Sequence, residues 1–208
     1  MTARASCAVC LRPQQTCICR WVAAVPNAVD VLILQHPMEV ANAKGSARLL
    51  HLSLSSSRLE VGEQFEPEQL AEWLDVDRQK GRRNVLLYPE TAGEVALGMA
   101  PPPSFDPAWL AAPQKLRLVV LDGTWRKSRK MLYLNPLLQQ LPRLPLRDTP
   151  PSHYLIRKAH LPDQLSTLEA TTYALAQLEG EAQRFAPLIE AFDGFVAQQA
   201  SYVAKRSA

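Results

Sequence analysis

The residues best suited to chemistry follow one apolar run in the middle of the chain. Residues 116–121 are Leu-Arg-Leu-Val-Val-Leu, and Asp122-Gly-Thr-Trp125 and Arg126-Lys-Ser-Arg-Lys130 come directly after them. A carboxylate can take up a proton, an indole ring can stack on a base, and cations attract phosphate. Ligands of open α/β sheets bind beyond the carboxyl ends of the strands. This stretch therefore predicts a ligand site with RNA phosphate close by.

A second polar cluster, Ser166-Thr-Leu-Glu-Ala170, opens a later helical pattern. Structural interpretations compete with chemical ones at both clusters. Asp122 and Thr124 can cap the helix that follows them, and Trp125 can lie in the core. Ser166 and Glu169 have the S-x-x-E spacing of a helix capping box.

All four cysteines lie within the first 19 residues, as Cys7-x2-Cys10 and Cys17-x-Cys19. In a reducing cytoplasm this clustering favours metal binding over disulfides, and four thiolates suit tetrahedral Zn²⁺. Reactive thiols and an iron–sulfur cluster are the alternatives. With no open coordination position, the metal would be structural. We expect a zinc module over residues 1–22 and a larger domain over residues 23–208.

Apolar runs and turn residues predict the elements that position these groups. Strands are expected at 29–35, 84–89 and 116–121, with weaker patterns for strands within 58–66 and over 153–158. Helices are expected at about 42–54, 67–80, 125–134, 166–179 and 184–204, with a short helix near 106–112 and an irregular segment over 140–151. Since apolar strands alternate with helices, we predict an α/β fold: a mainly parallel sheet with helices on both faces.

Further cations stand where they would extend the basic helix. Lys44 and Arg48 share one face of the predicted helix 42–54, although an ordinary solvated face explains that pair equally well. Arg12 and Arg20 on the cysteine module would extend the same surface. The candidate phosphate contacts are Lys44, Arg48, Arg126, Lys127, Arg129, Lys130, Arg157 and Lys158. His36, in the turn after the first strand, is either a structural residue or a base.

Composition excludes several classes of protein. The chain has 208 residues, and its net charge of +3 permits a nucleic-acid partner without requiring one. No apolar run approaches the roughly 18 residues of a membrane span, and the N-terminus lacks the apolar core of a secretory signal. A cytoplasmic protein without a membrane partner is therefore expected. No GxGxxG or GxxxxGK[ST] turn is present, which argues against a dinucleotide-binding Rossmann enzyme and a P-loop NTPase.

Four motifs in order are more specific than any one of them. They are the C-x2-C-x6-C-x-C pattern, His36-Pro-Met-Glu39, the D-x-T-W of Asp122–Trp125 and the S-T-x-E-A of Ser166–Ala170. Together they closely resemble the DTW-domain family, the tRNA-uridine aminocarboxypropyltransferases, from Cys7 to about Leu178. One departure stands out: the family often has Asn-Thr after the lysine of the next helix, where this chain has Gly45-Ser46.

The resemblance implies a SPOUT-like α/β fold with a C-terminal trefoil knot, S-adenosylmethionine as cofactor and tRNA as partner. The 3-amino-3-carboxypropyl group would pass to N3 of a uridine, expected in the variable loop of the tRNA, and methylthioadenosine would leave. Asp122 is the candidate base, or only a hydrogen-bond acceptor. The candidate cofactor contacts are Leu121, Thr124, Trp125, Ser166, Thr167 and Glu169. A SPOUT-type RNA methyltransferase and a non-catalytic zinc-containing RNA-binding protein are the alternatives. The choice between monomer and homodimer stays open.

Overall fold

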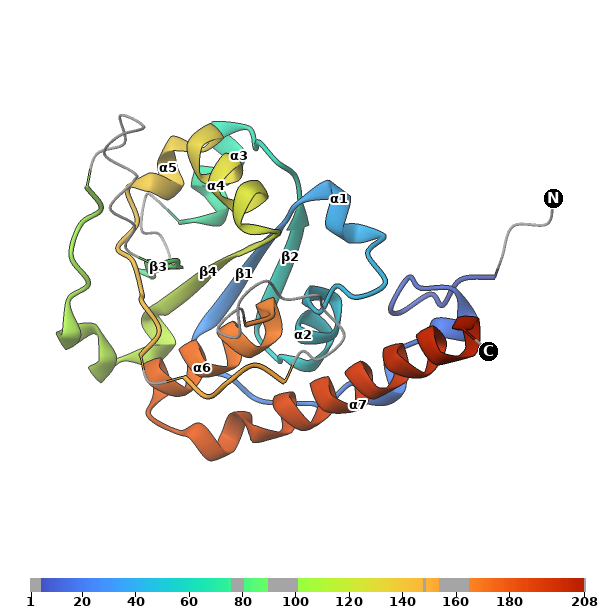
Figure 1. Cartoon of the computed structure of the whole chain (residues 1–208). Helices are drawn as coiled ribbons and strands as arrows, with labels where there is room; N and C mark the ends of the chain where they lie inside the picture. The colour runs from blue at the N-terminus through green and yellow to red at the C-terminus, as the bar shows by residue number, and fades with distance from the viewer. Residues whose placement is uncertain (1–4, 76–80, 90–100, 148, 154–164, 208) are drawn as a thin grey trace.

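A four-stranded parallel sheet forms the centre of the protein, seen here in a computed structural model (Figure 1). The structure describes residues 5–75, 81–89, 101–147, 149–153 and 165–207. The strand order is β2-β1-β4-β3, so the first and last strands along the chain lie side by side at the centre. The strands are β1 (Asp30–Gln35), β2 (Ser57–Val61), β3 (Arg83–Leu87) and β4 (Leu116–Asp122).

Helices cover both faces of the sheet, as predicted. One face packs against α2 (Ala47–Ser53), α6 (Thr167–Glu179) and α7 (Ala182–Ser207). The other packs against α3 (Pro67–Trp73), α4 (Trp125–Leu134) and α5 (Pro136–Gln139). Within the described residues, the other helical segments are α1 (Pro37–Val40) and short 3-10 turns at Gln14–Thr16, Cys19–Trp21, Pro107–Ala111 and Pro113–Lys115.

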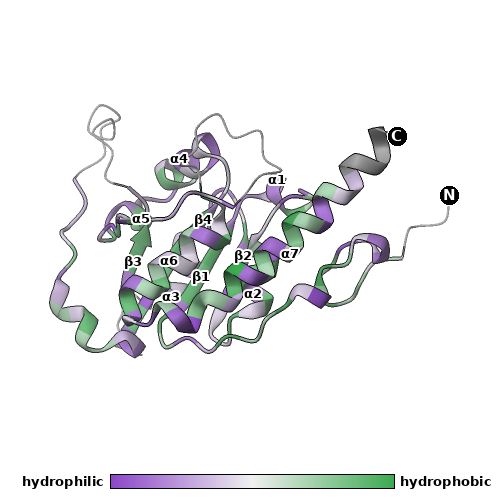
Figure 2. Ribbon diagram, turned by 60° about the horizontal axis from the view of Figure 1, so that its bottom comes forward, coloured by the Kyte–Doolittle hydropathy of each residue, from purple (hydrophilic) through white to green (hydrophobic). Residues whose placement is uncertain are grey.

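Side chains of the central strands point alternately to the two faces of the sheet, so both faces are buried under helices. In β1, Val31 and Ile33 join the core below α2 and α6, whereas Leu32 and Leu34 join the core below α3 and α4. All seven residues of β4 are buried. A strand that is buried on both sides is a nearly continuous apolar run, and in β4 only Arg117 and Asp122 interrupt it. Figure 2 shows β1 and β3 largely in green, between helices of mixed colour.

The predicted strands at 29–35, 84–89 and 116–121 are confirmed, as is a short strand within 58–66. The irregular segment 140–151 is confirmed for its described residues, and Arg143 bridges to Leu86 at the edge of β3. The short helix α5, which precedes this segment, was not predicted. Of the predicted strand 153–158, residues 154–158 lie outside the described residues. The trefoil knot and the SPOUT likeness stay predictions, because residues 154–164 are outside as well.

The predicted helix 42–54 is wrong in its first half. Pro37 starts a separate short helix, α1, because proline suits the first helical turn. Residues 41–46 then form a loop, and α2 begins only at Ala47. Lys44 and Arg48 therefore do not share a helix face, contrary to the prediction.

The predicted helix 67–80 also ends early. The last residue of α3 is Trp73, and Asp75 takes a left-handed conformation with φ 51°. That conformation cannot continue a right-handed helix. The predicted ends of α4 and α6 are confirmed: α6 ends at Gly180, which has φ 70°.

Candidate functional site

Asp122 lies at the point where the two central strands end. Its partner in the register of β1 is Gln35, whose Nε2 donates to Asp122 Oδ2 over 2.8 Å. Thr167, the first residue of α6, donates through Oγ1 to Asp122 Oδ1 over 2.6 Å. The backbone N–H of His36 donates to the carbonyl oxygen of Asp122. Only 5% of Asp122 is exposed, so side chains from β1 and α6 hold one buried carboxylate.

Thr124 and Trp125 turn outward directly after Asp122. Thr124 is the N-cap residue of α4, but its side chain makes no capping hydrogen bond. Trp125 is exposed, so its interpretation as a core residue is wrong. The polar turn therefore offers a hydroxyl and an indole ring to a ligand.

Ser166 and Glu169 form the capping box that their spacing predicted. The Glu169 carboxylate accepts from the backbone N–H of Ser166 over 2.7 Å and from that of His153 over 2.6 Å. It also accepts from the hydroxyl of Ser152. Glu169 is fully buried and lines neither of the cavities described below. Its observed contacts are those of a structural residue.

A pocket of about 670 Å³ opens beyond the ends of β3 and β4, within the usual range of small-molecule sites. Five of the six predicted cofactor contacts line it: Leu121, Thr124, Trp125, Ser166 and Thr167. Tyr88, which the sequence did not single out, packs edge-on against Trp125 with ring centroids 5.8 Å apart. Apolar residues of the segment 144–146 close the opposite wall.

A smaller, polar cavity of about 80 Å³ adjoins this pocket. Gly123, Ser166 and Thr167 line both spaces. The remaining lining comes from β4 and from α1 with the loop after it: Asp122, Glu39, Asn42, Lys44, Gly45 and Ser46. Asp122 therefore faces the small cavity rather than the large pocket.

Side chains from three elements support the turn around His36. Met38 N–H donates to His36 Nδ1, so the neutral ring carries its proton on Nε2 and donates to Glu63 Oε1 over 2.8 Å. Lys130 donates to the other oxygen of Glu63 over 2.7 Å. Lys130 first, and then His36, lower the pKa of Glu63 through these hydrogen bonds. His36 thus acts here as a structural residue, one of the two roles left open by the sequence.

The predicted phosphate contacts fall into separate places. On α4, Arg126 and Arg129 are exposed, and Arg126 also lines the large pocket. Lys127 pairs with Glu39 over 2.7 Å, and Lys130 pairs with Glu63. Lys44 lines the small cavity, and Arg48 is half-buried on α2. Arg157 and Lys158 lie outside the described residues.

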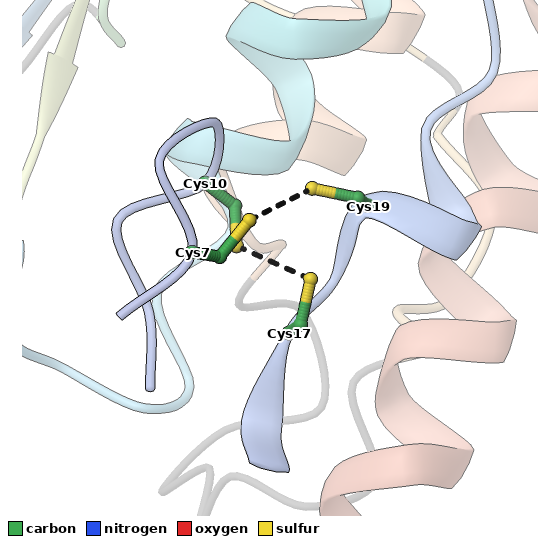
Figure 3. A group of neighbouring side chains, drawn as sticks. All are labelled: Cys7, Cys10, Cys17 and Cys19. Atoms are coloured by element: carbon green, nitrogen blue, oxygen red, sulfur yellow. Dashed lines mark hydrogen bonds between the residues drawn. The ribbon is translucent and has the colours of Figure 1, made fainter. Parts of the chain in front are cut away.

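The four cysteine sulfurs converge, with all four Sγ atoms within 4.8 Å of one another (Figure 3). Cys7 and Cys19 sulfurs are 3.6 Å apart, and those of Cys10 and Cys17 are 3.7 Å apart. A tetrahedron with metal–sulfur bonds of about 2.3 Å would separate its sulfurs by about 3.8 Å. The residues therefore fit a tetrahedral metal ion.

Backbone hydrogen bonds also favour the thiolate form of one of these cysteines. Hydrogen bonds from the backbone N–H groups of Cys10 and Val9 lower the pKa of Cys7 to about 6. Burial, followed by the neighbouring sulfurs, raises the pKa of Cys19 to about 12. The thiolate is the form that binds metal, so a bound cation would favour loss of the remaining protons.

The cysteine segment packs along the C-terminal half of α7 (Figure 1). Trp21 donates to Gln198 over 2.5 Å, and a Cβ on Gly194 would lie 2.3 Å from the Trp21 ring. Glycine at 194 is therefore required for this close approach. The Arg12 guanidinium lies over the Phe195 ring and donates to the carbonyl oxygens of two residues of the loop 41–46, Ala43 and Gly45.

This use of Arg12 differs from the predicted one. Its donors bind the protein's own backbone, so it is a structural link rather than part of a free basic surface. Arg20 is exposed and lies over the Trp21 ring. Cys10 and Ile18 belong to the main core, although the division into residues 1–22 and 23–208 stays a prediction.

Comparison with known proteins agrees with the motifs. The DTW domain matches residues 4–200. The chain belongs to the DTW-domain family. Named relatives include tRNA-uridine aminocarboxypropyltransferase 2 of Macaca fascicularis, 29% identical over 85% of this chain and 57% of the relative. The protein of the same name from Drosophila melanogaster is 30% identical over 86% of this chain and 69% of the relative.

A plant relative extends the same pattern. The tRNA-uridine aminocarboxypropyltransferase A of Arabidopsis thaliana is 28% identical over 62% of this chain and 50% of the relative. The chain spans little more than half the length of the mammalian relatives it matches. No solved structure matches the chain significantly. Among the described residues, no helix is both long and apolar enough to cross a membrane.

Some site residues were missed by sequence reasoning. Gln35, Tyr88 and Glu39 all follow or end apolar runs, which was the available signal. Gln35 could be assigned to Asp122 only once β1 was known to lie beside β4. Glu63 has no such signal, because it stands in a polar segment between two elements.

Proposed function

We propose that this protein transfers the 3-amino-3-carboxypropyl group of S-adenosylmethionine to N3 of a uridine in tRNA, in the cytoplasm. The donor supplies a sulfonium that activates the carbon next to it. Uridine N3 forms the new N–C bond as the C–S bond breaks, the electron pair passes to sulfur, and neutral methylthioadenosine leaves. The N3 proton passes to a base. The variable loop of tRNA is the target favoured by the family resemblance.

One observation carries this proposal: the two motifs of the family meet at a single pocket. Asp122 and Thr167 are 45 positions apart, yet their side chains are joined by a hydrogen bond of 2.6 Å. The residues around them line a pocket of about 670 Å³ with room for a nucleoside-sized ligand. The names of the relatives indicate the reaction class.

The large pocket suits the adenosine of the donor. Leu121 and the segment 144–146 give it apolar walls, and Thr124 gives it a hydroxyl. Trp125 and Tyr88 offer aromatic faces at the same pocket, and stacking on a base contributes roughly 1–3 kcal/mol. A knotted, SPOUT-like arrangement of residues 154–164 remains part of this proposal.

Asp122 is the residue we assign to the N3 proton of uridine. Its two oxygens accept hydrogen bonds from Gln35 and Thr167, which hold the carboxylate at the wall of the small cavity. The same geometry suits a residue that only orients N3–H. Turnover by an Asp122→Asn variant separates the two roles, as set out below.

Arg126 and Arg129 are the phosphate contacts that the geometry supports best. Both are exposed on α4, next to the large pocket. If they bind tRNA phosphates, affinity for tRNA should fall steeply as salt rises, because each contact releases counterions. Binding that does not change with salt would argue for an ordinary solvated face.

Zinc is the metal we propose for the four cysteines, in a structural role. Four sulfur ligands leave no open coordination position for a substrate. Elemental analysis of the purified protein should find one zinc ion per chain, and about none after all four cysteines are replaced by serine.

The deciding experiment is incubation of the protein with unmodified tRNA and S-adenosylmethionine, followed by mass spectrometry of the nucleosides. A uridine that gains the aminocarboxypropyl group, with release of methylthioadenosine, is expected. A methylated nucleoside would identify a methyltransferase instead. tRNA binding without any modified nucleoside would identify a non-catalytic RNA-binding protein.

A further inference from the structure

The small polar cavity is lined by charges of both signs, whereas Arg126 is the charged residue in the lining of the large pocket. Lys44 and Glu39 both line it, and Asp122 forms part of the same wall. We propose that this cavity binds the α-carboxylate and α-ammonium groups of the sulfonium donor, while the large pocket holds its adenosine. This inference rests on the proposed function and names the subsite that would orient the transferred arm.

Connection between the two spaces supports one ligand across both. Gly123, Ser166 and Thr167 line the pocket and the cavity alike. At this junction Gly123 has no side chain, and the other two residues carry only short hydroxyl groups. A ligand with its nucleoside in the pocket would therefore reach the cavity with a short flexible arm.

Size decides which part of the ligand fits. The cavity measures about 80 Å³, whereas a single water molecule occupies about 30 Å³ of liquid. It has room for a charged head group but not for a second nucleoside. Uridine would then have to approach the junction of the two spaces, where Thr167 is hydrogen-bonded to Asp122.

Opposite charges in one small space suit a zwitterion. Lys44 supplies a cation for a carboxylate. Glu39 is 8% exposed and supplies the opposite charge; its two oxygens accept from Lys127 over 2.7 Å and from Asn42 over 2.7 Å. A cavity wall with both a cation and a carboxylate matches the opposite charges of an amino-acid head group.

Contacts outside the cavity hold its walls in place. Arg12 donates to the carbonyl oxygens of Ala43 and Gly45 over 2.6 and 2.7 Å, which fixes the loop on both sides of Lys44. The hydroxyl of Ser46 accepts from the backbone N–H of Leu168 over 3.2 Å, which ties the same loop to the start of α6. The binding groups are thus positioned before the ligand arrives, which reduces the entropy lost on binding.

Two nucleosides that differ in this arm test the inference. S-adenosylhomocysteine carries the amino-acid arm, whereas methylthioadenosine lacks it. Calorimetry with the full-length protein should give a Kd for S-adenosylhomocysteine about tenfold or more below that for methylthioadenosine, as expected for charge-assisted hydrogen bonds. Lys44→Met should remove most of this preference and leave the Kd for methylthioadenosine unchanged within about twofold.

Lys115→Met is the matched control, because Lys115 is an exposed lysine at the opposite end of β4. It should keep the full preference. Glu39→Gln is the second variant, and it should also weaken the binding of S-adenosylhomocysteine but not that of methylthioadenosine. Thermal melting of each variant checks that its fold is retained.

Equal affinity of the wild-type protein for the two nucleosides would overturn the inference and leave the proposed function standing. A Lys44→Met variant that binds both nucleosides more weakly than the wild-type protein, and by the same factor, would also overturn the inference. Loss of tRNA affinity with an unchanged nucleoside preference would assign Lys44 to phosphate instead. A wild-type protein that binds neither nucleoside would overturn the proposed function itself.

Discussion

The cysteine cluster and the site around Asp122 are built in opposite ways. Cys7 and Cys19 are 12 positions apart, and a short segment brings all four sulfurs together. Asp122 instead forms hydrogen bonds with Gln35, which is 87 positions away in the sequence, and with Thr167, which is 45 positions away. The first site depends on a local turn and on the metal ion that we propose for it, whereas the second depends on the sheet. Damage to the first should therefore reduce stability, and damage to the second should reduce turnover.

The largest effect is expected at the cysteine cluster. Cys10 is buried in the main core and is one of the four candidate ligands. Cys10→Ser should lower the free energy of unfolding by about 4 kcal/mol or more, the size typical of a lost metal site. Urea denaturation measures this loss, and a chelator should destabilise the wild-type protein but not the variant. Equal effects of the chelator on both would show that the cluster holds no structural metal.

Asp122→Asn should have the opposite effect: it should reduce turnover strongly and change stability little. Loss of a general base reduces turnover by about 10²- to 10⁴-fold, while the similar shape of asparagine should keep the unfolding free energy within about 1 kcal/mol. Single-turnover kinetics with saturating donor measure the chemical step. Turnover close to that of the wild-type protein would sink the base hypothesis and leave Asp122 as an orienting residue.

Thr167→Val tests how strictly the carboxylate must be held. This change removes the hydrogen bond to Asp122 Oδ1, and we expect turnover to fall about tenfold, near the value of one hydrogen bond. Thr171→Val is the matched control, because Thr171 donates to the carbonyl oxygen of Thr167 and lies on the same helix. Similar turnover in the two variants would mean that the effect is one of helix stability alone.

Arg12→Met tests the link between the two regions. The loss of two hydrogen bonds to the loop 41–46 should raise KM for the donor several-fold and reduce stability by about 1–3 kcal/mol. Arg20→Met is the control, since Arg20 lies on the same segment but over Trp21. An unchanged KM in Arg12→Met would show that the loop holds its shape without the cysteine segment.

The smallest effect concerns the pH dependence of stability. Lys130 and His36 lower the pKa of Glu63 below its ordinary value of 4.5. A lowered pKa in the folded state adds stability above the ordinary value, and this is lost as pH falls through the folded-state value. The wild-type protein should therefore be slightly more stable than Glu63→Gln at pH 7, and the gap should close below about pH 4. A gap of constant size would contradict this contribution from Glu63.

Sequence predicted the sheet well because a strand buried on both faces must be an apolar run. Residues 29–35, 84–89 and 116–121 satisfy this rule, and their strands are present. The loop 41–46 could not be predicted, since its shape depends on Arg12 and Leu168, which are distant in sequence. The match of Ser166 and Glu169 to a capping box was local, so it was predicted correctly.

The site was predicted only in part for the same reason. The motifs identified Asp122, Thr124, Trp125 and Thr167, but their roles depend on strand order. Once β1 lies beside β4, Gln35 becomes a partner of Asp122, and no periodicity in the sequence reveals that pairing. The smaller cavity was missed because its lining joins α1, the loop after it, β4 and α6.

The buried carboxylate of Glu169 makes two separate parts of the chain depend on one side chain. It accepts hydrogen bonds from the backbone N–H groups of His153 and Ser166 at once. An apolar side chain at position 169 would leave the buried N–H of Ser166 without this partner, which costs about 1–3 kcal/mol. Residues 152–153 and the start of α6 would therefore lose their common attachment together.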